Sequence, residues 1–418
     1  MSSFVDAMQG SVEHCQAMAG QFPDLAEPYY QKIATYCQEK LWHQLTMILL
    51  EMVDDENKGT TLRPLSGADK NTFLALYQKV VSAVDKKINQ LSLARIAAAV
   101  AFSSLEAGST VEESKALLEE LLSKQESKPN NTATVLYLQS KLGLLTLNTS
   151  NNNASKEQLD KIYETIKTNG PLLNQLIPDT PEAIVVNSAH YEMSMTYFKI
   201  VGPPEAFYQE AIHYLNYYQP KEEGVADPKS HALAVDLCLA ALTGEGVYNL
   251  GQVVSNPILQ ALTNTPEAWL VDLLQACASG NVQQFKTLVN STYPSQIASQ
   301  PALVNMSQQM QEKMTLLGLV ELVFSKPASE RTLPFEEIAQ RLEIPIEQVE
   351  WVIMRAFSVE LMKGIMDQVE GIVHVTWILP RALGKEQMAD LATRFGEWAT
   401  KVSTTKAFMM EESPALTQ

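Results

Sequence analysis

Residues 363–377 read Lys-Gly-Ile-Met-Asp-Gln-Val-Glu-Gly-Ile-Val-His-Val-Thr-Trp, and this stretch predicts a β-hairpin. Val373, Val375 and Trp377 alternate with polar residues, which is the period of a half-buried strand. Gly371 stands immediately before that run and favours a tight turn. We therefore expect two antiparallel strands, one on either side of this glycine.

Three amphipathic helices are predicted directly before the hairpin. Apolar residues recur every three or four positions over residues 306–324, 334–342 and 345–361. Three helices followed by a two-stranded hairpin form the order of a winged helix, a module that binds either DNA or another protein. We place this module at residues 305–383.

The charge of the third helix separates these two uses of the module. It carries Glu347, Glu350 and Glu360 against the single cation Arg355, and the whole chain of 418 residues has a net charge of −17. A DNA-binding surface needs Lys and Arg to replace the counterions of the phosphates. Contact with protein is therefore the better interpretation, and a local basic patch that binds nucleic acid is the alternative.

The chain before the winged helix is predicted to be helical nearly throughout. Helical periodicity covers residues 29–53, 69–104, 111–124, 133–147, 156–168, 182–201, 204–217, 229–242, 266–278 and 281–290. Turn signals such as Asn169-Gly-Pro171 separate these segments, and strand patterns are almost absent before residue 364. Many helices joined by short loops are typical of a right-handed α-solenoid built from degenerate repeats. The expected fold class is mainly α.

The last predicted helix carries one narrow apolar stripe. Its members are spaced three and four residues apart, as in a coiled-coil seam: Met388, Leu391, Phe395, Trp398 and Val402. The helix either packs back onto its own winged helix or joins helices of other subunits. A free helix that exposes Trp and Phe is prone to aggregate unless it has a partner. We therefore favour a partner.

No catalytic, cofactor or metal site is predicted. The six histidines form no His-x-His or His-Glu-x-x-His pattern, and no phosphate-binding glycine motif occurs. His231 and Cys238 are separated by two helical turns, roughly 10 Å of rise, which is too far for direct contact. The four cysteines are far apart and suggest reduced thiols in helix cores. With no signal peptide or apolar span in view, we expect a soluble intracellular protein.

A solenoid that leads into a winged helix and ends in an amphipathic helix resembles the PCI family, found in the proteasome lid, the COP9 signalosome and translation initiation factor three. The likeness to a proteasome lid subunit is specific in three segments. They are Val247-Tyr-Asn-Leu-Gly-Gln-Val-Val-Ser-Asn-Pro-Ile-Leu259, Phe335-Glu-Glu-Ile-Ala339, and residues 352–381. On this resemblance we divide the chain into repeats (1–230), the helical part of the PCI domain (231–304), the winged helix (305–383) and a terminal helix with its tail (384–418).

The resemblance implies a non-catalytic scaffold in a hetero-oligomeric complex, located in the cytoplasm and the nucleus. Its partners would be other PCI subunits of the lid and a neighbouring ubiquitin-receptor subunit, without nucleic acid or membrane. The wing strand would extend a neighbour's sheet and the last helix would join a bundle. The implied partner contacts are Ile372, Val373, His374, Val375, Thr376, Trp377, Met388, Leu391, Phe395, Trp398 and Val402. A scaffold of the signalosome or of the initiation factor is the alternative.

Overall fold

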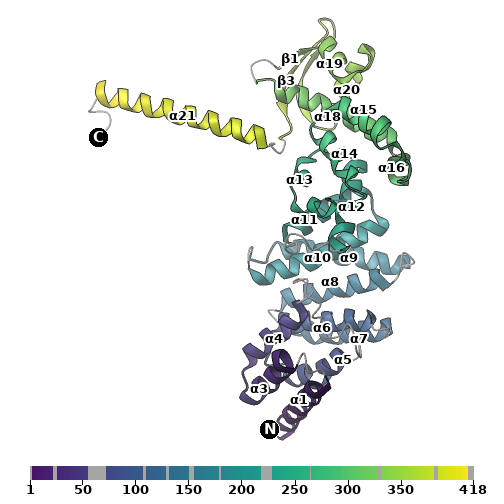
Figure 1. Cartoon of the computed structure of the whole chain (residues 1–418), viewed down its shortest axis with the longest axis vertical. Coiled ribbons are helices and arrows are strands. Elements are labelled where there is room, and N and C mark those ends of the chain that lie inside the picture. The colour runs from purple at the N-terminus through teal and green to yellow at the C-terminus, as the bar shows by residue number, and fades with distance from the viewer. Residues whose placement is uncertain are drawn as a thin grey trace. The chain divides into compact units, whose positions relative to one another are not determined.

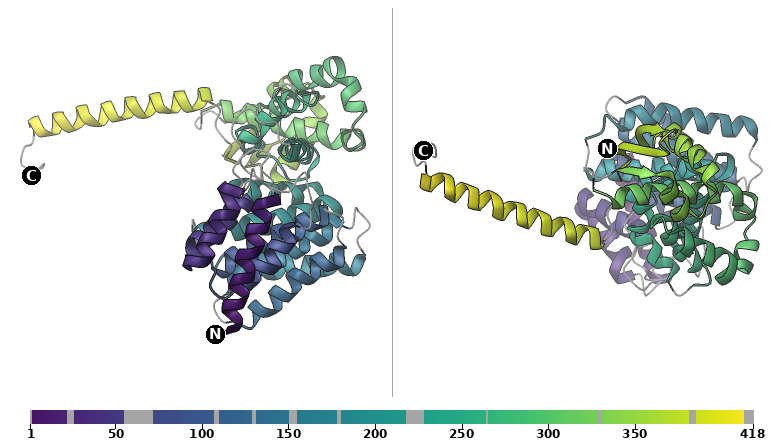
Figure 2. Two further views of the ribbon diagram at one scale, coloured as in Figure 1. Left: turned by 60° about the horizontal axis from the view of Figure 1, so that its bottom comes forward. Right: turned by 90° about the horizontal axis from the view of Figure 1, so that it is seen from above.

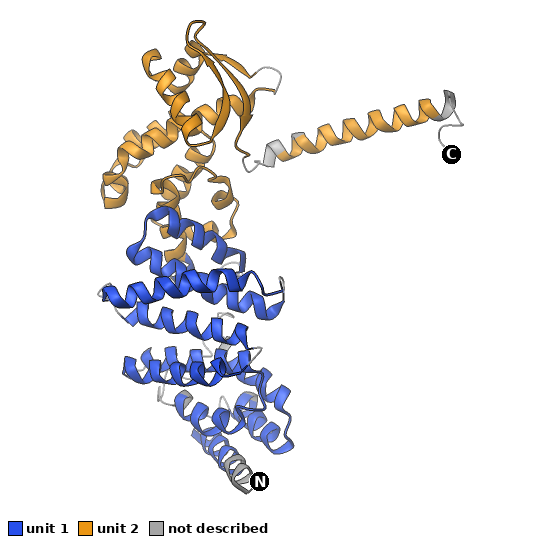
Figure 3. Ribbon diagram, turned by 180° about the vertical axis from the view of Figure 1, so that it is seen from behind, with its two compact units in different colours: residues 1–230 blue, residues 231–418 orange. Residues whose placement is uncertain are grey.

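The computed structural model describes the chain in two compact units, residues 1–230 and residues 231–418 (Figure 3). The described residues are 2–21, 26–54, 72–106, 110–128, 131–149, 155–177, 180–217, 228–263, 265–327, 331–380 and 385–412. The expected tail after residue 412 and Arg381 lie outside them. Helical repeats are followed by a small sheet within a winged helix, so the predicted mainly α fold is confirmed.

Unit 1 is an array of helices in which each element packs on its neighbours (Figures 1 and 2). Its elements are α1 (Ser2–Gln21), η1 (Ala26–Tyr30), α3 (Gln31–Glu39), α4 (Trp42–Asp54), α5 (Thr72–Leu76), η3 (Tyr77–Val81), η4 (Ser82–Val84), α6 (Gln90–Glu106), α7 (Val111–Glu126), α8 (Thr132–Thr149), α9 (Lys156–Leu173), α10 (Pro181–Val201) and α11 (Pro204–Tyr217). Helix α8 packs on α7 and α10, and α10 packs on α11. Met193 of α10 and Ala211 of α11 are both buried.

Local signals set most helix boundaries in unit 1. Thr110, Ser155 and Thr180 each accept a hydrogen bond from the backbone N–H three residues later, which satisfies a free donor at the helix start. The turn predicted at Asn169-Gly-Pro171 is wrong, because α9 continues through it to Leu173. Asn169 and Leu173 are buried on the same helix face, so packing outweighs the proline in the last turn.

Unit 2 continues with helices and then folds into the winged helix. Helix α12 (Pro228–Thr243) crosses the boundary between the units. The later elements are α13 (Gly251–Val254), η5 (Pro257–Leu262), α14 (Trp269–Ala278), α15 (Val282–Thr287), η6 (Leu288–Thr292), α16 (Pro294–Ala298), α17 (Pro301–Asn305), α18 (Ser307–Ser325), β1 (Thr332–Pro334), α19 (Phe335–Leu342), α20 (Ile346–Ser358), β2 (Met362–Asp367), β3 (Ile372–Ile378) and α21 (Lys385–Glu412). The three predicted helices of the module are therefore α18, α19 and α20.

The wing is a three-stranded antiparallel sheet in the order β1-β3-β2. Strand β3 pairs with β1 through Thr332↔His374 and with β2 through Ile365↔His374. The prediction that Ile372–Trp377 forms an exposed edge is therefore wrong. The short strand β1 supplies the unexpected partner, and three residues that include a proline give too little periodicity to be recognised. The edges of this sheet are β1 and β2.

Two glycines shape the hairpin. Gly371 has φ +64° at the turn, a conformation that residues with a side chain adopt at a cost. Gly364 lies at a register shift between β2 and β3, where a Cβ on this residue would meet the backbone of His374 and Val375. A Cβ at Gly364 would overlap the His374 carbonyl oxygen. The irregular β2–β3 pairing therefore requires glycine at this position.

Lys313 is a buried cation that joins α18 to the end of α12. Its Nζ donates to the carbonyl oxygens of Ala241 at 2.6 Å and Gly244 at 3.0 Å. These carbonyls lie at a helix C-terminus, where unpaired acceptors and the helix dipole favour a cation. Burial lowers the pKa of Lys313 from 10.5 to about 8. The contact therefore satisfies buried acceptors, while burial of the side chain disfavours the charge.

We predict that Lys313→Met changes how stability depends on pH. Between pH 8 and 10.5 the unfolded chain holds the lysine proton and the folded chain has released it, so stability from this residue rises with pH. The free energy of unfolding of the wild type should therefore gain up to about 3 kcal/mol relative to the variant across this window. Urea denaturation of both proteins at pH 7, 9 and 10 measures the gain. A constant difference would contradict it.

We also predict that Gly364→Ala destabilises unit 2 by about 2 kcal/mol or more, because a backbone atom cannot move aside as a flexible side chain can. The matched control is Gly396→Ala in α21, where no atom lies within 4 Å of the new Cβ. That change should be neutral or stabilise the helix by about 0.5–1 kcal/mol. Equal urea midpoints for the two variants would refute the close approach at Gly364.

Candidate functional site

Helix α21 presents its whole apolar stripe to solvent. Met388, Leu391, Phe395, Trp398 and Val402 are each between 40% and 65% exposed. Met409 continues the three-and-four spacing past Thr405 and is also exposed, and the sequence reasoning did not include it. The stripe is not buried against the described residues of the winged helix, and its contact with a partner stays a prediction. A continuous apolar face of this length is suited to packing against another helix.

Strand β3 contributes to two faces of the wing. Val373 and Val375 are buried in the inner face against the helices, so their side chains cannot reach a partner. His374 and Thr376 are exposed on the outer face, and His374 Nδ1 lies 2.9 Å from Thr332 Oγ1. The partially exposed residues Ile372 and Trp377 complete this group. A contact through these four exposed or partly exposed side chains stays a prediction.

Strand β2 offers an open edge beside this face. Val375 N–H donates to the Arg331 carbonyl oxygen, so the backbone N–H and C=O groups of Val375 point to β1. The backbone groups of the preceding residue, His374, therefore point to β2. The paired residue Ile365 then points its main chain at β3, and Met366 points outward. Ile365 is 72% exposed, which is unusual for a strand residue of this size. The edge can therefore accept a further strand and bury an isoleucine.

Trp377 of β3 and Lys363 at the start of β2 are in contact across the sheet. These two residues are paired across the sheet, and Lys363 Nζ lies 5.3 Å from the centre of the Trp377 ring. A cation over an aromatic face is attracted by the ring electrons. The contact holds the tryptophan over the outer face of the sheet rather than in the core.

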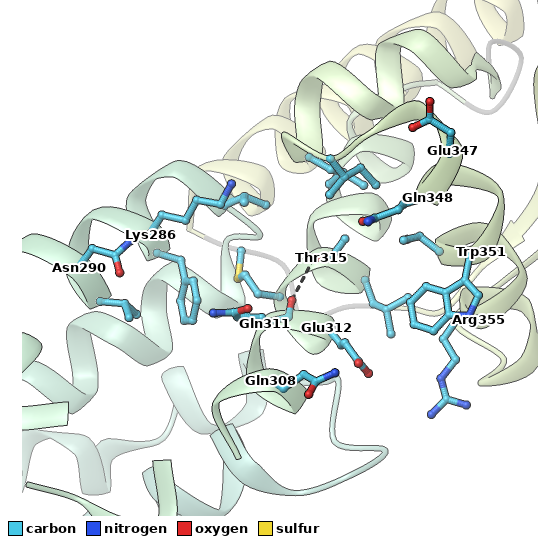
Figure 4. A pocket seen from close by; sticks show the side chains of 18 residues that line it. Lys286, Asn290, Gln308, Gln311, Glu312, Thr315, Glu347, Gln348, Trp351 and Arg355 are labelled. Atoms are coloured by element: carbon cyan, nitrogen blue, oxygen red, sulfur yellow. Dashed lines mark hydrogen bonds between the residues drawn. The ribbon is translucent and has the colours of Figure 1, made fainter. Parts of the chain in front are cut away.

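A hollow of about 690 Å³ lies between α15, α18 and α20 (Figure 4). Its apolar lining comes from Val282, Phe285, Val289, Met314, Leu316, Leu342, Ile344 and Val352. Side-chain amides of Asn290, Gln308, Gln311 and Gln348 and the exposed Trp351 stand around it (Figure 4). This size and mixture suit a short peptide segment or a large apolar side chain. The site was not predicted from the sequence, although Trp351 and Met354 lie outside the buried face of their helix.

The charges at this hollow are partly neutralised. Lys286 Nζ donates to Glu343 at 2.6 Å, and hydrogen bonds from Lys286 and Gln283 lower the pKa of the Glu343 carboxyl. On α20, Glu347 lines the hollow. Glu350, on the same helix, accepts a hydrogen bond from Gln368 of the wing at 2.9 Å. This helix surface therefore carries acidic side chains against the single cation Arg355, whereas phosphate contacts need several cations.

Unit 2 contains two buried thiols, Cys238 and Cys277. Burial raises the pKa of Cys238 and Cys277 to about 12, so both thiols stay protonated and unreactive at neutral pH. His231 Nε2 lies 3.2 Å from Glu267 Oε2. Within the ranges described, no three His, Cys, Asp or Glu side chains gather in a way that could hold a metal ion. Nor is any described helix both long and apolar enough to cross a bilayer.

Two family models match the chain. Residues 29–274 match the N-terminal repeats of PSD13, and residues 285–377 match the PCI domain. The first match covers most of unit 1 and extends into α14, and the second includes the winged helix up to Trp377. The segments that carried the likeness in the sequence therefore fall inside or beside these matches.

Similar proteins are found over nearly the full chain. The 26S proteasome non-ATPase regulatory subunit 13 homolog B of Arabidopsis thaliana is 31% identical over 406 residues, which cover 97% of this chain and 99% of that protein. The 26S proteasome non-ATPase regulatory subunit 13 of Dictyostelium discoideum is 30% identical over 402 residues, with 96% and 97% covered.

A more distant likeness concerns one of the alternative complexes. Subunit M of eukaryotic translation initiation factor 3 from Coccidioides immitis is 28% identical over 200 residues, 48% of this chain and 41% of that protein. The likeness therefore covers about half of the chain, whereas the proteasome subunits match both units. By the extent of these matches, the chain belongs to the family of 26S proteasome non-ATPase regulatory subunit 13, with PSD13-type N-terminal repeats and a PCI domain.

Proposed function

We propose that this chain is a non-catalytic scaffold subunit of the proteasome regulatory particle lid and thereby supports ubiquitin-dependent protein degradation. The observation that carries the proposal is the match to proteasome subunits along almost the whole length of both chains. Shared length supports a shared role in a complex, because both the repeats and the PCI domain are retained. The proposed lack of catalytic activity is supported by the protonated thiols of Cys238 and Cys277 and by the pairing of His231 with Glu267.

Within this proposal, unit 2 provides two kinds of attachment. The apolar stripe of α21 joins a bundle with helices of other subunits, because five large side chains along one helix face are exposed. Strand β2, rather than the central strand β3, accepts a strand from a neighbour. Edge addition supplies main-chain hydrogen bonds, and Ile365 adds a side chain that the neighbour can cover.

The proposed partners are other PCI subunits of the lid, with a ubiquitin-receptor subunit beside the solenoid. Nucleic acid and membrane are not proposed as partners, because α20 displays acidic and apolar side chains and the chain has a net charge of −17. Location in both the cytoplasm and the nucleus is part of the same proposal. A lid subunit would be needed wherever assembled proteasomes degrade ubiquitinated proteins.

Affinity purification of the tagged full-length chain, followed by quantitative mass spectrometry, tests the function. The wild type should recover lid and ATPase-ring subunits of the proteasome. Leu391→Asp combined with Trp398→Asp should reduce this recovery at least tenfold, because two charges would enter an apolar interface. The isolated double variant should keep its urea midpoint, since both side chains are exposed. Recovery of signalosome or initiation-factor subunits would overturn the function, and full recovery by the variant would overturn the bundle role.

Ile365→Lys tests the open edge of β2. A lysine on an edge strand opposes the addition of another strand, so incorporation into the lid should fall about tenfold or more. Ile365→Thr is the control, because threonine keeps the strand preference without adding charge. Both variants should remain folded, because the side chain is 72% exposed. Normal incorporation of the lysine variant would show that β2 is not the attachment edge.

A further inference from the structure

The charged residues of α21 are arranged unevenly around its apolar stripe. If Met388 and Leu391 take positions a and d of a heptad, Phe395 and Trp398 take the next a and d, and so on along the helix. Arg394 and Lys401 then fall at g, and Lys406 falls at e. Glu397, the single anion between residues 391 and 409, falls at c on the outer side.

Positions e and g border the seam on its two sides, and there they meet charges of a partner helix. Over residues 391–409 these positions hold Ala392, Arg394, Ala399, Lys401, Lys406 and Phe408. Every charged side chain that borders the seam in this range is therefore a cation. The three cations are exposed, and none forms an ion pair with another residue in the part of the chain described here.

This arrangement opposes pairing of α21 with a second copy of itself. In a parallel pair e faces g of the partner, and in an antiparallel pair like positions face each other. Either way cations would meet cations, and like charges in such pairs are destabilising. Flanking charges in coiled coils set the choice of partner. The apolar seam therefore allows helix packing, and its borders restrict the partner.

We propose that α21 selects a partner helix whose apolar stripe is bordered by Asp and Glu, and that it rejects helices with basic borders, its own copy included. This inference deepens the bundle role given under the proposed function and rests on it for the identity of the complex. A preference for an acidic helix is the opposite of what the net charge of the chain alone predicts, because a net charge of −17 attracts a basic peptide at long range. A local preference for an acidic helix must therefore come from the borders of the seam.

Two synthetic probes test the preference directly. Both are amphipathic helices of the length of α21 with a leucine and isoleucine seam, one with Glu and the other with Lys at positions e and g. Binding to the full-length chain is measured by fluorescence anisotropy. The Glu probe should bind about tenfold more tightly or better than the Lys probe at low salt, because attractive pairs replace repulsive ones. The ratio should shrink towards one at 1 M salt, where charges are screened within about 3 Å.

Two triple variants with the same change in net charge separate the seam borders from the bulk charge. Arg394→Gln, Lys401→Gln and Lys406→Gln together should abolish the preference for the Glu probe. Thr393→Glu, Thr400→Glu and Ala407→Glu, all at the outward position f, should leave it intact. Circular dichroism and urea midpoints confirm that both variants keep the helix. Equal loss in the two variants, or tighter binding of the Lys probe by the wild type, would overturn the proposal.

Failure of the charge selection can be distinguished from failure of the proposed bundle role. If the Leu391→Asp and Trp398→Asp double variant loses lid assembly while the wild type shows no probe preference, the bundle role stands and the charge selection fails. If the wild type prefers the Glu probe while the double variant still assembles, the selection stands and the bundle role fails.

Discussion

Unit 2 depends on the packing around α18, a helix that is largely buried from Lys313 to Val323. Ten of its residues are buried, and α14, α15, α17, α19, α20 and β3 all contact it. Gly318 lets the neighbours approach, because a Cβ there would meet Leu342 and Val282 at 2.9 Å. The largely apolar segment Leu316–Val323 has to be enclosed, and its enclosure fixes the winged helix to the preceding helices. The Lys313 contact to the end of α12 adds a polar tie to the same helix.

The apolar face of α21, in contrast, is not covered by other described residues. In unit 1 each amphipathic helix is covered by the next, and in unit 2 the elements gather on α18. The stripe of α21 is exposed over its described length, and its basic borders restrict what can cover it. The open edge of β2 is a second unsatisfied surface in the same unit. A rigid enclosed unit that carries two uncovered surfaces is the form expected of a scaffold, in which stability and attachment reside in different elements.

The sequence predicted the elements that have strong periodicity and missed those that do not. Helices α10, α11 and α18 and the hairpin at Gly371 follow from regular spacing and a turn residue. Strand β1 has three residues, and its pairing with β3 depends on the fold of the whole module. The central position of β3 in the sheet therefore could not be predicted from local sequence patterns. The stripe of α21 was found because it repeats, whereas the hollow beside Trp351 joins three helices that are distant in sequence.

Hydrogen exchange of the full-length chain, alone and within purified regulatory particles, tests most directly whether α21 and β2 are the attachment surfaces. In the isolated chain the amides of α21 should exchange rapidly, because no neighbour covers the helix, and those of α18 should be protected in both states. In the complex, the account predicts at least hundredfold slower exchange along α21 and at the outward amide of Met366. Unchanged exchange in both segments, with new protection elsewhere, would contradict it.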